Sequence, residues 1–307
     1  MKKYLLILIA AAHTSVCIGQ NKADEKGKET EDSFIEKSAS ILDRAGGIHN
    51  ASNIGLFIEN RGKLYPRRLT QGPSGEFPIN STKHYVYRIN PMVGIKGNVI
   101  QGRYTTDEEW EAAYGYHNRD LALIAFSDNP DTWNRKLGWP VKDAEGNPII
   151  KSDQDSYAVY NDSGNTKKIL GIEVHQIGYA YGVKFVQNMI FFTFKVINKS
   201  QDNYTGVYFD MYTDMDVGNV SGGDPEYDDD KVGFTPEKRL VYFYDDGISN
   251  EWPDGKTGLM AIAFLKTPEV NGTQLGITDF HYNQYNDDID LDTVQYGIMS
   301  SDPNLYN

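Results

Sequence analysis

Cysteine is almost absent from this 307-residue chain, which has only Cys17. One cysteine cannot form an intramolecular disulfide, and a chain of this length buries enough apolar surface to fold without one. The sequence also contains no Cys pair, no His-Glu-x-x-His and no Gly-x-Ser-x-Gly pattern. Thiol, zinc-protease and serine-hydrolase chemistry therefore have no support from motifs.

Long apolar runs and positive charge are also scarce. The longest apolar run, residues 4–12, is far shorter than the ~20 residues of a membrane-spanning helix. The formal net charge is -13, and it becomes -15 without Lys2 and Lys3. Nucleic acids and anionic membranes are bound by basic surfaces. We therefore expect no transmembrane segment and no nucleic-acid partner.

The N-terminus has the layout of a secretory signal peptide. Lys2 and Lys3 precede the apolar residues 4–12, and Cys17-Ile18-Gly19 offers a small-x-small cleavage site before Gln20. Residues 1–19 are therefore predicted to be a signal peptide. The predicted location is secreted or on the outer-membrane surface.

A second interpretation of the same segment is a lipoprotein acylated at Cys17. Such a site usually has a small residue directly before the cysteine and leucine near the third position back. Val16 and Thr14 fit that pattern poorly. Soluble secretion is therefore the preferred interpretation, with the lipoprotein kept as the alternative.

The rest of the chain divides into a leader and a β-rich part. Residues 20–45 are predicted to be a charged leader that ends in a short helix before Gly46-Gly47. Residues 46–307 are predicted to form a β-rich extracellular domain, and a division into two sub-sheets near residue 150 stays open. Thr106 and Glu109 form a capping-box pattern that predicts a helical turn over residues 107–113.

Seven short apolar runs separated by turn residues fill the second half of the chain. Their spacing, with 21 Tyr and 13 Phe in total, predicts an all-β fold: an antiparallel β-sandwich or meander with long loops and one or two short helices. Within the run 188–200, Phe192, Phe194 and Val196 share one face and Thr193 and Lys195 the other, which indicates one buried and one solvated face. The runs are 167–182, 188–200, 205–214, 230–234, 239–246, 258–266 and 275–283.

Residues 210–230 hold seven aspartates and one glutamate with no lysine or arginine before Lys231. Calcium binds six to eight oxygen ligands and is often held by Asp-x-Asp loops with a nearby glycine. We therefore predict a structural Ca²⁺ bound by Asp214, Asp216, Asp228, Asp229 and Asp230. The EF-hand pattern is not met, and a solvated acidic turn is the alternative. A second group, Asp153, Asp155 and Asp162, is open to the same two interpretations.

Glu173 and His175 lie two residues apart on a predicted strand and so share a face. They could form an acid–base pair or bind a transition metal, but a hydrogen-bonded surface pair is more common. No catalytic residue is assigned. Trp133, Trp139 and Trp252 lie in loop-like sequence and are candidates for sugar stacking, although tryptophans more often close the edge of a small core.

Several strings in residues 53–302 carry a family resemblance: "NIGLFIENRGKLYP", "QDSYAVYND", "LGIEVHQIGYAYG", "IFFTFKVINKS", "VYFDMYTDMDVG", "DDKVGF" and "IMSSDP". With them the chain resembles the N-terminal domain of uncharacterised secreted β-rich proteins of Bacteroidetes-like bacteria associated with type IX secretion. The resemblance implies an all-β extracellular or cell-surface domain and no activity. The C-terminal sorting module of many members is not within these residues, so we expect either the front part of a longer protein or release by another route.

Together these observations predict an extracellular or cell-surface binding or structural domain, stabilised by calcium and without catalysis of its own. Its partners would be a glycan or a cell-surface protein. The alternative is a secreted glycan-active enzyme or a carbohydrate-binding module, because aromatic residues beside acids are how many β-sandwiches hold sugars.

Overall fold

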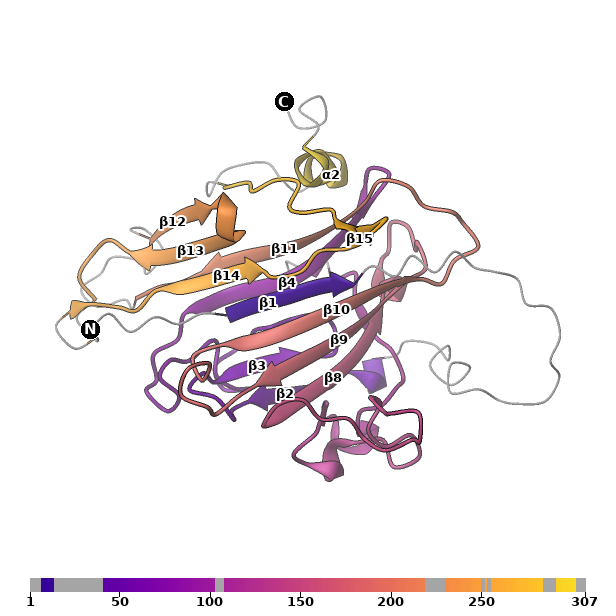
Figure 1. The fold of residues 1–307 in the computed structure, drawn as a ribbon, viewed down its shortest axis with the longest axis horizontal. Coiled ribbons are helices and arrows are strands. Elements are labelled where there is room, and N and C mark those ends of the chain that lie inside the picture. The colour runs from indigo at the N-terminus through magenta and orange to yellow at the C-terminus, as the bar shows by residue number, and fades with distance from the viewer. Residues whose placement is uncertain are drawn as a thin grey trace.

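A computed structural model describes residues 7–13, 41–102, 108–218, 230–249, 252, 255–283 and 291–301. In this part of the chain the fold is all-β, as predicted, with one α-helix (Figure 1). The strands are β1 (Ile7–His13), β2 (Gly46–His49), β3 (Leu56–Glu59), β4 (Val86–Ile95), β5 (Asn98–Ile100), β6 (Glu111–Ala112), β7 (Ala125–Phe126), β8 (Gln154–Asn161), β9 (Ile172–Ala180), β10 (Ile190–Asn198), β11 (Val207–Met215), β12 (Asp230–Thr235), β13 (Leu240–Asp245), β14 (Met260–Phe264), β15 (Glu269–Val270) and β16 (Thr273–Gln274). The helix is α2 (Asp292–Ser300), and short 3-10 helices are η1 (Ile41–Asp43), η2 (Arg119–Leu121), η3 (Pro130–Thr132), η4 (Asp162–Gly164) and η5 (Pro236–Lys238).

The largest element is a nine-stranded sheet in the order β12-β13-β14-β1-β10-β9-β8-β6, with β7 also paired to β8. A three-stranded sheet, β11-β4-β5, lies behind it in Figure 1. Phe192 and Phe194 of the large sheet belong to the same buried cluster as Ile89, Val93 and Met211 of the small one. The main core therefore fills the space between the sheets, as in a sandwich.

Strand β10 shows how the sequence pattern produces this arrangement. Phe192 and Phe194 are completely buried, whereas Lys195 between Phe194 and Val196 is exposed. Side chains of a strand alternate between its faces, so one face reaches the core and the other faces outward. The predicted alternation in this run is confirmed.

Strand β11 has its second face covered rather than solvated. Phe209 and Met211 pack on the main core, but Tyr208 and Tyr212 pack in a separate cluster with Met299 of α2. Residues 292–300 form this helix, α2. The helix buries Met299 against the outer face of the β11-β4-β5 sheet.

Six of the seven predicted runs contain a strand, from β9 to β14. Residues 275–283 are the exception and form no regular element. The capping-box prediction was also wrong where it can be followed: residues 108–110 are irregular and Glu111–Ala112 is strand β6. Glu111 pairs with Asn161 and Ala112 with Tyr160 of β8, so this segment is an edge strand of the large sheet.

Sheet membership does not divide at residue 150. Strands β6 and β7 precede that point and pair with β8, and β4 pairs antiparallel with β11 more than a hundred residues later. Non-local pairing of this kind joins the two halves of the chain into common sheets.

The segment predicted to be a signal peptide contributes strand β1 through residues 7–13. Residues 20–40 of the predicted leader lie outside the described residues, and its last part contains η1. No helix in the described ranges is both long and apolar enough to cross a membrane.

Candidate functional site

A pocket of about 340 Å³ lies in the segment between β6 and β8, and Trp133 is one of the residues that line it. This segment covers the outer face of β8, where Tyr157 and Val159 pack with Tyr116, Leu137 and Trp139 in a cluster of their own. The pocket is therefore built by a long loop anchored on a sheet, an arrangement common to binding sites. Its remaining lining comes from Asn118, Leu121, Pro130, Asp131, Asn134, Arg135 and Gly138.

Trp133 is held in one orientation. Its indole Nε1–H donates a 2.6 Å hydrogen bond to the carbonyl of Phe126, and its ring lies 5.7 Å from that of Trp139. The carboxamide of Asn129 caps η3 directly before it by accepting from the Asp131 N–H at 3.1 Å. Trp133 is half-buried, so a residue whose indole is held in place is among those that line the pocket.

The polar groups of the pocket divide into occupied and available ones. The Asn118 side chain donates to the Asp131 carbonyl at 2.6 Å and accepts from the Leu121 N–H at 3.2 Å, so it holds the loop together. Asp131 and Arg135 are exposed, and within the described part of the chain neither side chain has a partner. The pocket thus offers one carboxylate acceptor and one guanidinium donor beside an indole.

Only one of the three predicted sugar-stacking tryptophans borders this pocket. Trp139 is 1% exposed and donates its indole N–H to the Ile149 carbonyl at 3.0 Å. Trp252 is 7% exposed and donates to the Tyr85 hydroxyl at 2.9 Å. Trp139 packs in the smaller cluster over β8 and Trp252 in the main core, and core packing is the more common role for tryptophan.

His117 lies next to Trp133, and the backbones of the two residues form an isolated antiparallel β-bridge. Burial lowers the pKa of His117 to about 4, and the charge of Arg119 lowers it further in the same direction. The imidazole is therefore neutral at physiological pH. The charge of the pocket wall comes from Asp131 and Arg135 and not from this histidine.

Glu173 and His175 form a hydrogen-bonded relay with a third residue. The His175 Nε2 lies 2.9 Å from Glu173 Oε1, and its Nδ1 lies 2.5 Å from the Tyr157 hydroxyl. The Glu173 side chain is 6% exposed and that of His175 is 14% exposed. Both imidazole nitrogens are occupied and neither residue lines the Trp133 pocket, so the relay fits the structural interpretation.

A buried pair that sequence reasoning missed joins His49 and Ser156, whose Nε2 and Oγ lie 2.8 Å apart. The two residues are 107 positions apart and no motif connects them. They resemble a nucleophile and its base, but they are 0% and 1% exposed, so a substrate cannot reach them. Burial lowers the pKa of His49 to about 3, which keeps it neutral.

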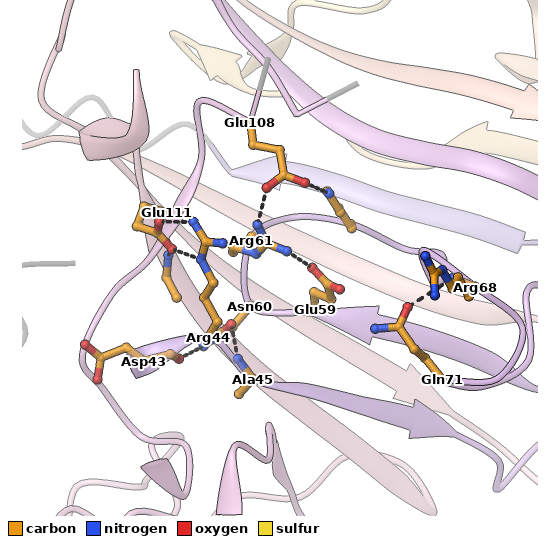
Figure 2. A network of polar contacts seen from close by, with 12 residues as sticks. Asp43, Arg44, Ala45, Glu59, Asn60, Arg61, Arg68, Gln71, Glu108 and Glu111 are labelled. Atoms are coloured by element: carbon orange, nitrogen blue, oxygen red, sulfur yellow. Dashed lines mark hydrogen bonds and ion pairs between the residues drawn. The ribbon is translucent and has the colours of Figure 1, made fainter. Parts of the chain in front are cut away.

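An ion-pair network links the start of β2, the turn after β3 and the start of β6 (Figure 2). Arg44 binds Glu111 through two hydrogen bonds of 2.9 and 2.6 Å. Arg61 donates to Glu59 and to Glu108 at 2.6 Å each, and Lys63 also donates to Glu108.

The charges of this network are balanced. Burial alone would raise the pKa of Glu108, but the bond and charge of Lys63 and the pairing with Arg61 outweigh it and hold that pKa below its usual value. Because these charges neutralise one another, we interpret the network as a clamp between distant segments rather than a reaction centre.

The predicted calcium ligands are only partly described. Asp214 ends β11, paired in register with Arg88 of β4, and burial raises its pKa while Arg88 lowers it. Asp216 follows the strand, and Asp230 begins β12. Asp228 and Asp229 lie outside the described residues. In the described ranges, no three His, Cys, Asp or Glu side chains gather as a metal-binding group.

The second acidic group is used by the backbone. The Asp162 carboxylate accepts from the Gly171 N–H at 3.2 Å, the Ile172 N–H at 3.0 Å and the Leu170 N–H. Asp155 accepts from the Lys151 and Ser152 N–H groups at 2.8 Å each. These contacts favour the interpretation that the aspartates stabilise turns, and not that they bind a cation.

No protein-family model matches the chain, and no curated protein or solved structure matches it either. Function is therefore inferred from the side chains and their geometry.

Proposed function

We propose that this chain is an extracellular or cell-surface binding domain that holds a saccharide in the Trp133 pocket and carries out no chemistry on it. The observation that carries the proposal is that one pocket is lined by Trp133, whose indole is held by a hydrogen bond, and by the exposed residues Asp131 and Arg135. Sugar rings bind in this way: their C–H faces stack on an aromatic ring and their hydroxyls bond polar groups at the edge.

The size of the pocket indicates a small ligand. Its volume of about 340 Å³ lies at the lower end of the range of about 300–1,000 Å³ seen for ligand sites. The Arg135 guanidinium can donate to several sugar oxygens, and the Asp131 carboxylate can accept from two hydroxyls. A mono- or disaccharide unit at the end of a glycan fits this chemistry.

The rival is a glycan-active enzyme. A glycosidase needs two carboxylates about 5 to 9.5 Å apart on either side of the scissile bond. Asp131 is the one acidic residue among those that line the pocket in the described structure. Binding therefore has more support than hydrolysis.

Calcium at the loop between β11 and β12 is part of the same proposal. Asp230 lies directly opposite Asp245 in the β12–β13 register, and like charges in that position repel. A divalent ion bound by Asp214, Asp216 and the 228–230 aspartates would relieve such repulsion. Against it stands Arg88 beside Asp214, which already supplies positive charge.

Residence outside the cell rests on the signal-peptide layout of residues 1–19 and on the resemblance to type IX-associated secreted proteins. Both stay predictions. In this setting the glycan or cell-surface protein expected as partner would present its terminal sugar to the pocket.

A glycan array followed by isothermal titration calorimetry of the bound sugars tests the proposal. Asp131→Ala and Arg135→Ala remove exposed side chains and should leave the fold intact, and each should weaken binding about tenfold. Trp133→Ala should abolish it. The matched control is Phe185→Ala, which removes an aromatic ring that is 84% exposed elsewhere.

Two results would contradict the proposal. Binding that survives both Trp133→Ala and Arg135→Ala would place the ligand elsewhere. Release of reducing ends from any bound polysaccharide would make the domain an enzyme.

A further inference from the structure

Strand β1 occupies a slot between β10 and β14, where it runs parallel to both neighbours (Figure 1). Leu8 lies in register with Phe191 on one side and with Ala263 on the other. Strands β10 and β14 are not paired with each other, so β1 alone joins β12–β14 to the rest of the nine-stranded sheet.

The parallel orientation marks β1 as an inserted strand. The other strand pairs described in this sheet are antiparallel. Antiparallel neighbours can be joined by short hairpins, whereas a parallel neighbour must arrive by a separate route. Strand β1 has the geometry of β-strand addition, in which an extended segment completes a sheet through main-chain hydrogen bonds.

The same seven residues lie inside the segment predicted to be a signal peptide, residues 1–19. Export with cleavage after Gly19 would remove β1 and leave β10 and β14 as two facing edges with unpaired backbone groups. The walls below that gap are strongly apolar: Phe192, Phe194, Met260 and Ile262 are at most 2% exposed. An empty slot would open this core to water.

The part of the processed chain that the structure describes offers no replacement strand. The described strands β2 to β16 are paired elsewhere, and Phe280 of the apolar run 275–283 stacks on Phe234 at 4.7 Å. The stretches of seven or more residues outside the description, 20–40, 219–229 and 284–290, each hold at least three charged residues. A second processed copy has the same composition, so we take a segment of a different protein as the occupant.

We propose that the processed chain is a strand acceptor: the slot between β10 and β14 binds an extended apolar segment of about seven residues from another polypeptide, parallel to both edges. The segment lies in the position of residues 7–13. This is a protein-binding activity separate from the saccharide pocket, which lies in the loop over β8.

The test uses the chain recovered after export, with its N-terminus read by intact mass, and a fluorescent peptide of residues 2–15 as the probe strand. Fluorescence anisotropy should show saturable binding to the processed chain. The full chain that retains β1 should bind at least tenfold more weakly, because its slot is filled. The matched control peptide carries Leu8→Pro and Ile9→Pro, which cannot donate to the ladder and should also lose at least tenfold.

A photo-crosslinker at the Leu8 position of the peptide should attach to β10 or β14. If the processed chain is unfolded by itself, refolding with the probe but not with the proline peptide supports the proposal equally. An exported chain that still begins at Met1, no saturable binding or rescue, or crosslinks confined to other elements would overturn it.

Discussion

The carboxylate of Asp230 accepts a hydrogen bond from the backbone N–H of Val217 at 3.1 Å. Val217 follows the end of β11 and Asp230 begins β12, so this contact ties together the two ends of the acidic stretch. Asp245 lies opposite Asp230, and its carboxylate accepts from the Ser249 hydroxyl at 2.5 Å. The negative charge of this region is therefore concentrated at one end of the sheet.

Calcium should stabilise the protein through this region. For an extracellular site with a dissociation constant of about 0.1 to 1 mM, 10 mM Ca²⁺ would add roughly 1 to 3 kcal/mol to the free energy of unfolding. Differential scanning calorimetry with and without EDTA measures this. Asp216→Asn should reduce the effect, whereas Asp202→Asn, an exposed aspartate elsewhere, should not. An unchanged Tm on adding calcium would show that no calcium ion stabilises this region.

The ion-pair network should be sensitive to the loss of one partner. Glu108→Gln leaves Lys63, whose side chain is 3% exposed, without its carboxylate. We expect a loss of about 3 kcal/mol in the free energy of unfolding. The double variant Glu108→Gln with Lys63→Met should recover part of it, because the buried charge is then gone. Urea denaturation measures both variants.

The control is the exposed pair Lys266–Glu269, with a separation of 3.5 Å and side chains 42% and 43% exposed. Glu269→Gln should cost less than about 0.5 kcal/mol. Equal losses at the two sites would show that burial does not govern the network.

Acid should destabilise the protein through His49. Its pKa is lowered to about 3 in the folded state by burial, from an ordinary 6.5, so the unfolded chain binds the extra proton first. Stability therefore rises with pH between about 3 and 6.5, and this group loses roughly 2 to 3 kcal/mol from pH 7 to pH 4.5. His49→Gln should flatten that part of the urea-denaturation profile.

Ser156→Ala is the matched control for His49. It removes the hydroxyl that contacts the imidazole and keeps the titrating group, so the protein should be less stable at every pH with the same slope. If His49→Gln left the slope of stability against pH unchanged, His49 would not be buried in its neutral form.

Glu109 should act in the opposite direction. Burial raises its pKa to about 7, partly offset by the Gln101 N–H at 2.9 Å and by Lys167, so the folded state holds a proton that the unfolded chain releases near pH 4.5. Stability from this group is highest below pH 4.5 and is lost as pH rises to 7. Glu109→Gln should therefore stabilise the protein by about 2 kcal/mol at pH 8, with no gain at pH 4.5.

Glu111 provides an internal comparison two residues away. Burial would raise its pKa, but its bonds to Arg44 hold it below the usual value. Glu111→Gln should therefore destabilise the protein at pH 8. The same sign of change for both variants would show that the two environments do not differ as described.

Local pattern predicted much of the fold and little of the site. The alternation of Phe192, Thr193 and Phe194 was enough to assign the buried face of β10, because side-chain direction in a strand has a fixed period of two. The same rule placed Glu173 and His175 on one face. It gave no information on Tyr157, which reaches His175 from the neighbouring strand.

The choice among the tryptophans was beyond the sequence. Trp133, Trp139 and Trp252 all lie in similar loop-like surroundings, yet one borders a pocket and two are buried. The difference depends on where Phe126, Ile149 and Tyr85 place their hydrogen-bond acceptors. The acceptor of Trp252 is 167 residues away, and those of Trp133 and Trp139 are 7 and 10 residues away but belong to no sequence pattern.

The sequence by itself determined the strand-forming runs, the all-β class and the acidic character, since these depend on composition and on alternation along the backbone. Tertiary structure alone decided that α2 covers β11, that Arg61 meets Glu108 and that β1 lies between β10 and β14. The physical reason is that these contacts join residues tens to hundreds of positions apart. Their energy depends on burial and on which edges remain unpaired, and neither is encoded in any short stretch of chain.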